Sequence, residues 1–373
     1  MVIKVNKDDL LKAVNIADAC IGSKNSNTVL SNCLLNASAE SIEILATDNE
    51  IAIRTRIDAA SDKEGSFAAN GKKMSQILRE FPSGETSLSI SSAYQVNFKA
   101  DGIKGKYTLL GQSSDSYPEI PAFEEENAIE IEQATFKEML KKVIHAASSE
   151  AIKPVFNGIY VAFENGNMTM VATDSRRLSF ITRKLDSELP EKGVIIPLKT
   201  VNQVLRVLGN DGNMLFSYND SQVFFRIEDT EIVSRVVDGK FPNYNQVLPK
   251  EQTVTATVDA KKLNESLRRA MIFTREPSNK VVLHFSNNKL TLDVNTPDLG
   301  ESKEELSIES NCTEEISLGI NGAFFMDSLK EISTPFVRLG LTDSMKPFSI
   351  SPEDDDNYIS VIMPIQIKNV EEK

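Results

Sequence analysis

The chain carries one pattern of helix and strand signals three times, and this repeat restricts the possible folds more than any other feature. An amphipathic segment opens each copy, as DDLLKAVNIA at 8–17, TFKEMLKKVI at 135–144 and KLNESLRRAM at 262–271. Leu10, Phe136 and Leu263 correspond, at separations of 126 and 127 residues. Such a period predicts three copies of one domain rather than a single large core.

Each copy contains a second helical pattern and a pair of alternating segments. The second helix recurs as KKMSQILREF at 72–81, KTVNQVLRVL at 199–208 and AFFMDSLKEI at 323–332. Apolar and polar residues alternate over 41–57, 167–183 and 289–306, with Thr47, Thr173 and Thr296 at the turns. Alternation broken by a tight Thr-Asx turn is typical of two antiparallel strands. The sequence therefore predicts an α+β fold, with two helices and antiparallel sheets in each copy.

Pro-rich segments mark the ends of the first two copies. SYPEIP occupies 116–121 and KFPNYNQVLP occupies 240–249. These segments predict domains over residues 1–121, 122–250 and 251–373. Three tandem copies of one fold can form an arc that a symmetry-related copy completes into a ring. They can also remain three independent domains joined by linkers.

The residue inventory excludes several classes of site. Only His145 and His284 are present, so a histidine metal cluster or a Ser-His-Asp triad has almost nothing to be built from. The three cysteines lie far apart, and no nucleotide-binding glycine motif or membrane-length apolar run occurs. We interpret the run Asp354, Asp355 and Asp356 as a solvated loop. We expect a cytoplasmic protein with no metal, no cofactor and no catalytic site.

Positive charge is concentrated in the predicted helices. The windows 7–19, 72–80, 134–149, 199–208, 260–275 and 322–333 carry −1, +2, +2, +2, +4 and −1, a total of +8 in a chain of −13. If the helices share a face, that face carries Lys12, Lys72, Lys73, Arg79, Lys137, Lys141, Lys142, Lys199, Arg206, Arg268 and Arg269. A basic lining attracts the phosphate backbone of DNA without reading its bases, although basic helix faces also occur in proteins that bind no nucleic acid.

Seven short segments, in order over almost the whole chain, carry a family resemblance. They are LLKAV at 10–14, ATDNE at 46–50, FNGI at 156–159, VATDSRRL at 171–178, VDGKFPNYNQVLP at 237–249, LTDS at 341–344 and YISVIMPIQI at 358–367. With these segments the chain resembles the beta sliding clamps of the bacterial DNA polymerase III holoenzyme. The resemblance implies three tandem clamp domains that close as a head-to-tail homodimer into a six-domain ring.

The function implied by this resemblance is that of a DNA polymerase processivity factor. The ring would encircle duplex DNA, slide along it and tether its partners. Those partners would be the polymerase catalytic subunit, an ATP-dependent clamp loader and other proteins with a clamp-binding peptide. By resemblance, Lys24, Lys73, Lys153 and Lys199 face the DNA, and Pro154 and Val155 stand where some members carry aromatic residues.

The resemblance also implies a groove that receives a short partner peptide. Its residues would be Phe156, Thr173, Ser175, Arg176, Leu178, Pro242, Val247, Val361, Met363, Pro364 and Ile365. The terminal segment 358–367 alternates strictly, and such a stripe is also typical of a core strand. Ser175, Gln246 and Gln366 replace a Gly and two Arg residues that are common in the family.

The resemblance places the ring seam between the first domain of one subunit and the third domain of the other. Tyr107 and Leu109 would lie on one side, and Ile272 and Phe273 on the other. Because they end a basic helix, Ile272 and Phe273 could equally pack in the interior.

Two other functions fit parts of the sequence. One is a peptide-binding scaffold that does not encircle DNA. The other is a hydrolase that uses Asp48 and Asp174 of the two ATD turns, although these residues lie in different predicted domains.

Overall fold

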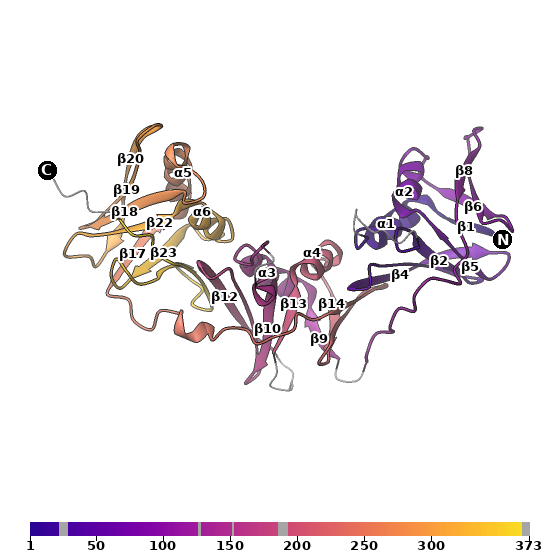
Figure 1. Cartoon of the computed structure of the whole chain (residues 1–373), viewed down its shortest axis with the longest axis horizontal. Coiled ribbons are helices and arrows are strands. Elements are labelled where there is room, and N and C mark those ends of the chain that lie inside the picture. Colours follow the sequence, from indigo (N-terminus) through magenta and orange to yellow (C-terminus); the bar gives the residue numbers. More distant parts are fainter. Residues whose placement is uncertain (22–28, 126–127, 151–152, 186–192, 368–373) are drawn as a thin grey trace. The chain divides into compact units, whose positions relative to one another are not determined.

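The computed structural model describes residues 1–21, 29–125, 128–150, 153–185 and 193–367. The chain forms two compact units (Figure 1). Unit 1 contains residues 1–137 and 199–236, and unit 2 contains residues 138–198 and 237–373. The predicted middle domain therefore contributes to both units, which are described separately below.

A 12-stranded antiparallel sheet forms the frame of unit 1. Its main path runs β8 (Tyr107–Leu110), β7 (Gln95–Ala100), β6 (Glu85–Ile90), β1 (Val2–Asn6), β4 (Ile51–Ser61), β16 (Thr230–Arg235), β15 (Gln222–Ile227), β14 (Asn213–Tyr218) and β9 (Ile129–Glu132). A branch adds β3 (Ser41–Thr47), β2 (Cys33–Ala37) and β5 (Gly65–Ala69). Strands β4 and β16 pair directly, so backbone hydrogen bonds join the first predicted domain to part of the second.

Helices α1 (Lys7–Asp18), α2 (Gly71–Arg79) and α4 (Leu198–Val207) lie together in unit 1. Asn6 and Asn70 cap the first two helices, because each side-chain oxygen accepts from backbone amides of the first turn. The hydroxyl of Ser75 on α2 lies 2.7 Å from the side-chain oxygen of Asn15 on α1. Gln203 on α4 donates to the carbonyl of Ala19, just after α1, at 2.9 Å. These bonds fix α2 and α4 beside α1.

Unit 2 contains a nine-stranded and a four-stranded antiparallel sheet. The larger runs β13 (Gly193–Pro197), β10 (Gly158–Glu164), β11 (Asn167–Thr173), β12 (Arg177–Lys184), β25 (Tyr358–Ile362), β24 (Phe348–Pro352), β23 (Phe336–Leu341), β17 (Val254–Asp259) and β21 (Glu309–Ser310). The smaller runs β20 (Gly300–Ser307), β19 (Lys289–Thr296), β18 (Lys280–Ser286) and β22 (Ile316–Asn321). Strands β12 and β25 join the second predicted domain to the third.

Helices α5 (Ala260–Ala270) and α6 (Gly322–Lys330) belong to unit 2, while α3 (Gln133–Ile144) contributes to both units. Asp259 and Asn321 cap α5 and α6. Helix α5 ends at Ala270, earlier than its sequence window, and a 3-10 turn, η3 (Met271–Phe273), follows it. Two further 3-10 turns are η1 (Pro154–Phe156) and η2 (Tyr244–Gln246). The six α-helices found among the described residues, together with the antiparallel sheets, confirm the predicted α+β class.

The Thr-Asx turns are alike in the first two copies and different in the third. The Thr47 hydroxyl donates to the carbonyl of Ile51 at 2.9 Å, and the Thr173 hydroxyl donates to the carbonyl of Arg177 at 2.6 Å. The Thr296 hydroxyl donates instead to the carbonyl of Phe273, outside its own hairpin, at 2.6 Å. The third turn is thereby tied to η3. Among the described residues, no helix is long and apolar enough to span a membrane.

Candidate functional site

An apolar pocket of about 250 Å³ lies on the larger sheet of unit 2. Four segments form it: η1, the turn between β11 and β12, the segment 241–247, and the end of the chain from β25 onward. The lining residues are Phe156, Thr173, Ser175, Arg177, Leu178, Phe241, Pro242, Asn243, Tyr244, Val247, Val361 and Met363. A concave apolar surface with a few polar groups at its rim is typical of a ligand or peptide site.

A cluster of hydrophobic residues forms part of the pocket wall and packs behind it. Its buried members are Val171, Leu178, Ile195, Phe241 and Val361. The ring of Tyr160 stacks on Phe241 with centroids 5.0 Å apart and planes 11° apart. Tyr244 packs against Tyr160 and Phe180 at centroid distances of 6.2 and 5.8 Å. Stiff aromatic side chains lose little rotamer freedom, so the pocket wall is well ordered before a ligand arrives.

The turn from Thr173 to Arg177 positions three of the lining residues. The Thr173 hydroxyl accepts from the amide of Ser175 at 3.1 Å. Oδ1 of Asp174 accepts from the amides of Arg176 and Arg177 at 2.9 and 3.0 Å. The carbonyl of Arg176 accepts from the amide of Met363 at 2.8 Å, which links the turn to the end of the chain. Ser175 has φ of 74°, a left-handed conformation that favours glycine over residues with a side chain.

The structure brings most of the predicted groove residues together. Eight line the pocket: Phe156, Thr173, Ser175, Leu178, Pro242, Val247, Val361 and Met363. Pro364 and Ile365 do not line it. The amide of Ile365 donates to the carbonyl of Gly319 at 2.7 Å, so the chain turns toward the smaller sheet after Met363. The predicted peptide-binding role of these residues stays a prediction at this point.

The arginine at the pocket is Arg177, not the predicted Arg176. Arg177 begins β12 and its side chain lines the pocket, with 13% of its surface exposed. Arg176 lies in the turn, is exposed, and places its guanidinium 5.4 Å from the ring of Phe324. Two adjacent arginines in VATDSRRL made this ambiguous in the sequence, because only the turn geometry decides which one faces the pocket.

Sequence reasoning also missed Phe241, Asn243 and Tyr244 of the pocket. The sequence predicts a domain end at KFPNYNQVLP, and the family resemblance assigns only Pro242 and Val247 of this segment to the groove. Aromatic residues flanking a proline in a loop were a usable signal, since exposed loops rarely carry several aromatic side chains without a packing reason.

Several predicted DNA-facing cations lie on the helices of unit 1. Lys72, Lys73, Arg79 and Arg206 are exposed. Arg206 of α4 and Lys12 of α1 line one cavity of about 500 Å³ between their helices. The structure therefore places two cations from different helices side by side within this unit.

Lys199 is exposed, but its ammonium pairs with the carboxylate of Asp48. Partial burial opposes ionisation of Asp48, yet the hydrogen bond from Lys199 and the amides of Ile51 and Glu50 hold its pKa below the usual value. Lys199 is thus less available to phosphate than a lysine without a carboxylate partner.

Lys141, Lys142 and Lys153 of the predicted cations lie in unit 2, and one of these three differs from the expectation. Lys141 and Lys153 are exposed, and the Lys153 ammonium lies 5.5 Å from the ring of Phe156. Lys142 is only 14% exposed and pairs with Glu138 at 3.0 Å and Asp355 at 3.5 Å. Its charge is neutralised inside the fold, so the structure argues against a DNA contact there. Lys24 lies outside the described residues.

The predicted seam residues lie at sheet edges or beside them. Strand β8 is an edge of the unit 1 sheet, and Tyr107 and Leu110 on it are 40% and 74% exposed. Leu109 is partly buried. In unit 2, β20 is an edge of the smaller sheet. Ile272 on η3 is 68% exposed, whereas Phe273 is partly buried.

The carboxylates of the two ATD turns already have partners. Asp48 accepts from two turn amides and pairs with Lys199. Asp174 accepts from two turn amides and from Nε of Arg177 at 3.1 Å. The described part of the chain contains no cluster of three or more histidine, cysteine or acidic side chains arranged to hold a metal. The geometry therefore does not support the alternative function of a hydrolase that uses Asp48 and Asp174.

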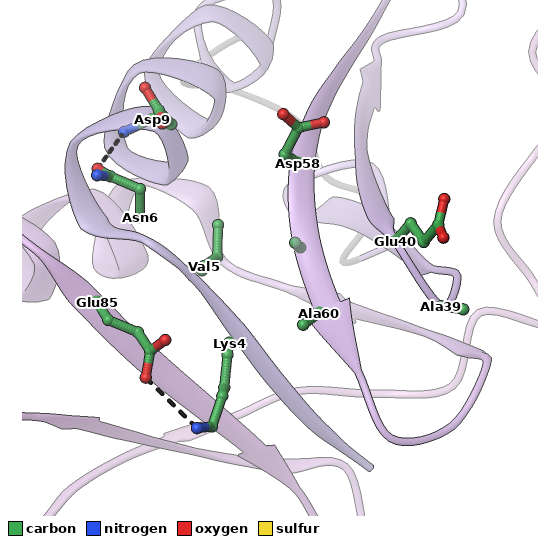
Figure 2. A pocket seen from close by; sticks show the side chains of 10 residues that line it. Lys4, Val5, Asn6, Asp9, Ala39, Glu40, Asp58, Ala60 and Glu85 are labelled. Atoms are coloured by element: carbon green, nitrogen blue, oxygen red, sulfur yellow. Dashed lines mark hydrogen bonds and ion pairs between the residues drawn. The ribbon is translucent and has the colours of Figure 1, made fainter.

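A third pocket, open and of about 530 Å³, lies in unit 1 around β1 and β4 (Figure 2). Asp9, Glu40, Asp58 and Glu85 lie around it, and Lys4 pairs with Glu85 at 3.5 Å. Asp9 stands in the first turn of α1, where a carboxylate stabilises the positive end of the helix dipole. This pocket shares no residue with the groove.

Comparisons with known proteins match one family along almost the full length of this chain. Three family models match: the N-terminal, central and C-terminal domains of the DNA polymerase III beta subunit, over residues 1–121, 130–243 and 245–366. A beta sliding clamp of Halalkalibacterium halodurans is 25% identical, with 97% of this chain and 98% of the relative covered. A beta sliding clamp of Treponema pallidum is 26% identical, with 98% and 100% covered.

Solved structures show the same fold. The DNA polymerase III beta subunit of Thermotoga maritima superposes with a TM-score of 0.91 at 26% identity, covering 98% of this chain and 99% of that one. A sliding clamp of Pseudomonas aeruginosa bound to griselimycin gives a TM-score of 0.93 at 23% identity, covering 98% and 100%. With three tandem clamp domains matched in order, this chain belongs to the DNA polymerase III beta subunit family, the beta sliding clamps.

Proposed function

We propose that this protein is a DNA polymerase processivity factor that acts as a homodimeric ring around duplex DNA. The observation that carries this proposal is the family match along the full chain, in three consecutive domains. We propose that these domains comprise residues 1–121, 122–250 and 251–373. Enclosure would hold the protein on DNA, so the chain itself needs neither a catalytic site nor a cofactor, and it would act in the cytoplasm.

The free edges of the two units support head-to-tail closure. Strands β8 and β20 each have a paired neighbour on one side only among the described residues. Exposed edges pair readily with another chain, and a two-fold axis would produce two identical seams, each joining a first domain to a third. In this arrangement Tyr107 and Leu109 face Ile272 and Phe273 of the other copy. Ile272, which is largely exposed, would form the apolar plug.

The exposed cations support sequence-independent contact with DNA. By family resemblance, the helices line the hole of the ring. Lys72, Lys73, Arg79, Lys141, Lys153 and Arg206 are exposed on or next to helices in a chain of net charge −13. A few exposed cations on a protein of net negative charge attract the phosphate backbone of DNA only weakly. Weak attraction suits a ring that must slide, because tight phosphate contacts would resist movement.

The apolar pocket suits a short peptide from the polymerase, the clamp loader or another partner. Burying two apolar anchor side chains contributes about 3 to 6 kcal/mol, reduced by the cost of ordering the peptide. Two anchors alone therefore give an affinity no tighter than tens of micromolar, and the roughly micromolar affinity that we predict at best, about −8 kcal/mol, needs further contacts of the peptide. Such an affinity lets partners exchange on one ring.

The decisive experiment compares circular with linear DNA. The protein is loaded on nicked circular duplex by an ATP-dependent bacterial clamp loader and isolated with the DNA by gel filtration. We expect it to stay on circles and to leave within minutes after a restriction enzyme linearises them. Protein retained equally on linear DNA would contradict enclosure. Failure to load at all, with intact peptide binding, would favour a scaffold that does not encircle DNA.

A further inference from the structure

Arg177 connects the groove to a helix of the third domain. Its side chain lines the pocket, while Nη1 donates to Asp327 of α6 at 2.9 Å. The centre of its guanidinium also lies 4.2 Å from the ring of Phe324, one turn earlier on the same helix. One side chain therefore contacts both the ligand space and α6.

The same guanidinium is linked to the turn that forms the pocket rim. Its Nε donates to Oδ2 of Asp174 at 3.1 Å, and Oδ1 of that carboxylate accepts from the amides of Arg176 and Arg177. Asp174 is 8% exposed and Asp327 is 33% exposed. Asp327, Arg177 and Asp174 thus form a continuous chain of charge-assisted bonds from α6 to the turn, and such bonds are strong and directional.

We propose that Asp327 is a positioning residue of the groove, which holds the guanidinium of Arg177 at the pocket wall and out of the ligand space. This inference rests on the proposed peptide-binding function. Arg177 is largely buried, so a guanidinium that loses one of its two carboxylates must find water or another acceptor. The open space beside it is the pocket that it already lines. Without Asp327 the charged group turns into that space and competes with an apolar peptide anchor.

The test measures peptide affinity in the full-length protein. The probe is a fluorescein-labelled synthetic hexapeptide that ends in Leu-Phe, titrated with each variant and followed by fluorescence anisotropy. For Asp327→Asn we expect Kd to rise about 3- to 10-fold. Asp327→Glu keeps the charge and is expected to bind within about twofold of wild type. Asp327 also pairs with Lys330, three residues later, at 2.9 Å. Asp343→Asn, which removes the acidic partner of Lys346 in a pair of the same spacing, is therefore the matched control.

A second background separates positioning from general destabilisation. Arg177→Met removes the charged group that Asp327 holds. In that background we expect Asp327→Asn to change Kd by less than about 1.5-fold, because coupled residues are non-additive. An Asp327→Asn variant that binds like wild type would overturn the inference, and so would an effect of equal size in the Arg177→Met background. Absence of binding by the wild-type protein would overturn the groove assignment itself, and the inference with it.

Discussion

At the scale of single residues, His145 shows how burial controls a titratable group. It follows α3, and its Nε2 lies 3.5 Å from the hydroxyl of Ser360. Its Nδ1 is buried and has no hydrogen-bond partner among the described residues. Desolvation lowers the pKa of His145 to about 4, and the positive charge of Arg177 adds to the shift while Asp327 opposes it. The ring is therefore neutral at physiological pH.

This shift predicts a pH dependence of stability. The unfolded chain binds a proton on His145 below about pH 6.5, whereas the folded chain does so only near pH 4. Acidification therefore favours the unfolded state, by about 2 kcal/mol between pH 6.5 and pH 5. Urea unfolding at pH 7, 6 and 5 should show that His145→Gln loses less stability than wild type over this range. Parallel losses in the two proteins would contradict a neutral buried histidine.

The groove residues show what sequence could and could not determine. The assignment of Thr173, Leu178, Pro242 and Val361 to the groove came from the family resemblance, and all four line the pocket. The choice between Arg176 and Arg177 depends on the turn, and the contact of Arg177 with Asp327 joins residues 150 positions apart. A pairing of that range leaves no local pattern in a single sequence.

At the scale of elements, the hairpins and helices were the most predictable part of the fold. Strand pairs 41–47 with 51–61 and 167–173 with 177–184 lie where alternation and the Thr-Asx turn predicted them. The end of α5 was not predictable from periodicity, since Met271, Ile272 and Phe273 continue the apolar pattern in a 3-10 turn. The prediction of a solvated loop for the acidic run 354–356 is correct only in part, because side chains of β12 and α3 pair with one of its carboxylates.

Asp355 is only partly solvated, unlike the rest of that run. It accepts from Arg183 at 2.7 and 3.3 Å, pairs with Lys142 at 3.5 Å and is 21% exposed. Arg183 also pairs with Glu138 of α3 at 2.9 Å. This cluster fixes the loop before β25 to β12 and α3, and therefore helps to hold the strand that carries Val361.

We expect Asp355→Asn to lower the free energy of unfolding by about 1 to 3 kcal/mol, because it leaves two poorly solvated cations with one acceptor fewer. The neighbouring Asp356→Asn is the matched control. Asp356 pairs with Arg338 but is 84% exposed, so its loss should cost at most about 0.5 kcal/mol. Urea unfolding midpoints measure both. Equal effects of the two substitutions would show that the cluster is not a stabilising unit.

At the scale of the whole molecule, the proposed seam makes oligomeric state the first property to measure. Ile272→Glu places a charge on the largely exposed apolar side chain that the seam would bury, so we expect a monomer near 41.3 kDa at micromolar concentration. Met345→Glu changes another exposed apolar residue of the third domain, 65% exposed, and should leave the dimer intact. Sedimentation equilibrium distinguishes the two. A dimeric Ile272→Glu protein would remove Ile272 from the seam.

The pairings of β4 with β16 and of β12 with β25 have a consequence for how a closed particle comes apart. Each pairing joins two domains of the same polypeptide. The effective concentration of the two paired strand edges therefore stays high at any dilution. A junction between two separate chains has no such tether and weakens as the protein is diluted. Breakage of the proposed ring on dilution should therefore yield whole subunits, and the proposed clamp loader would need to open only the junction between chains.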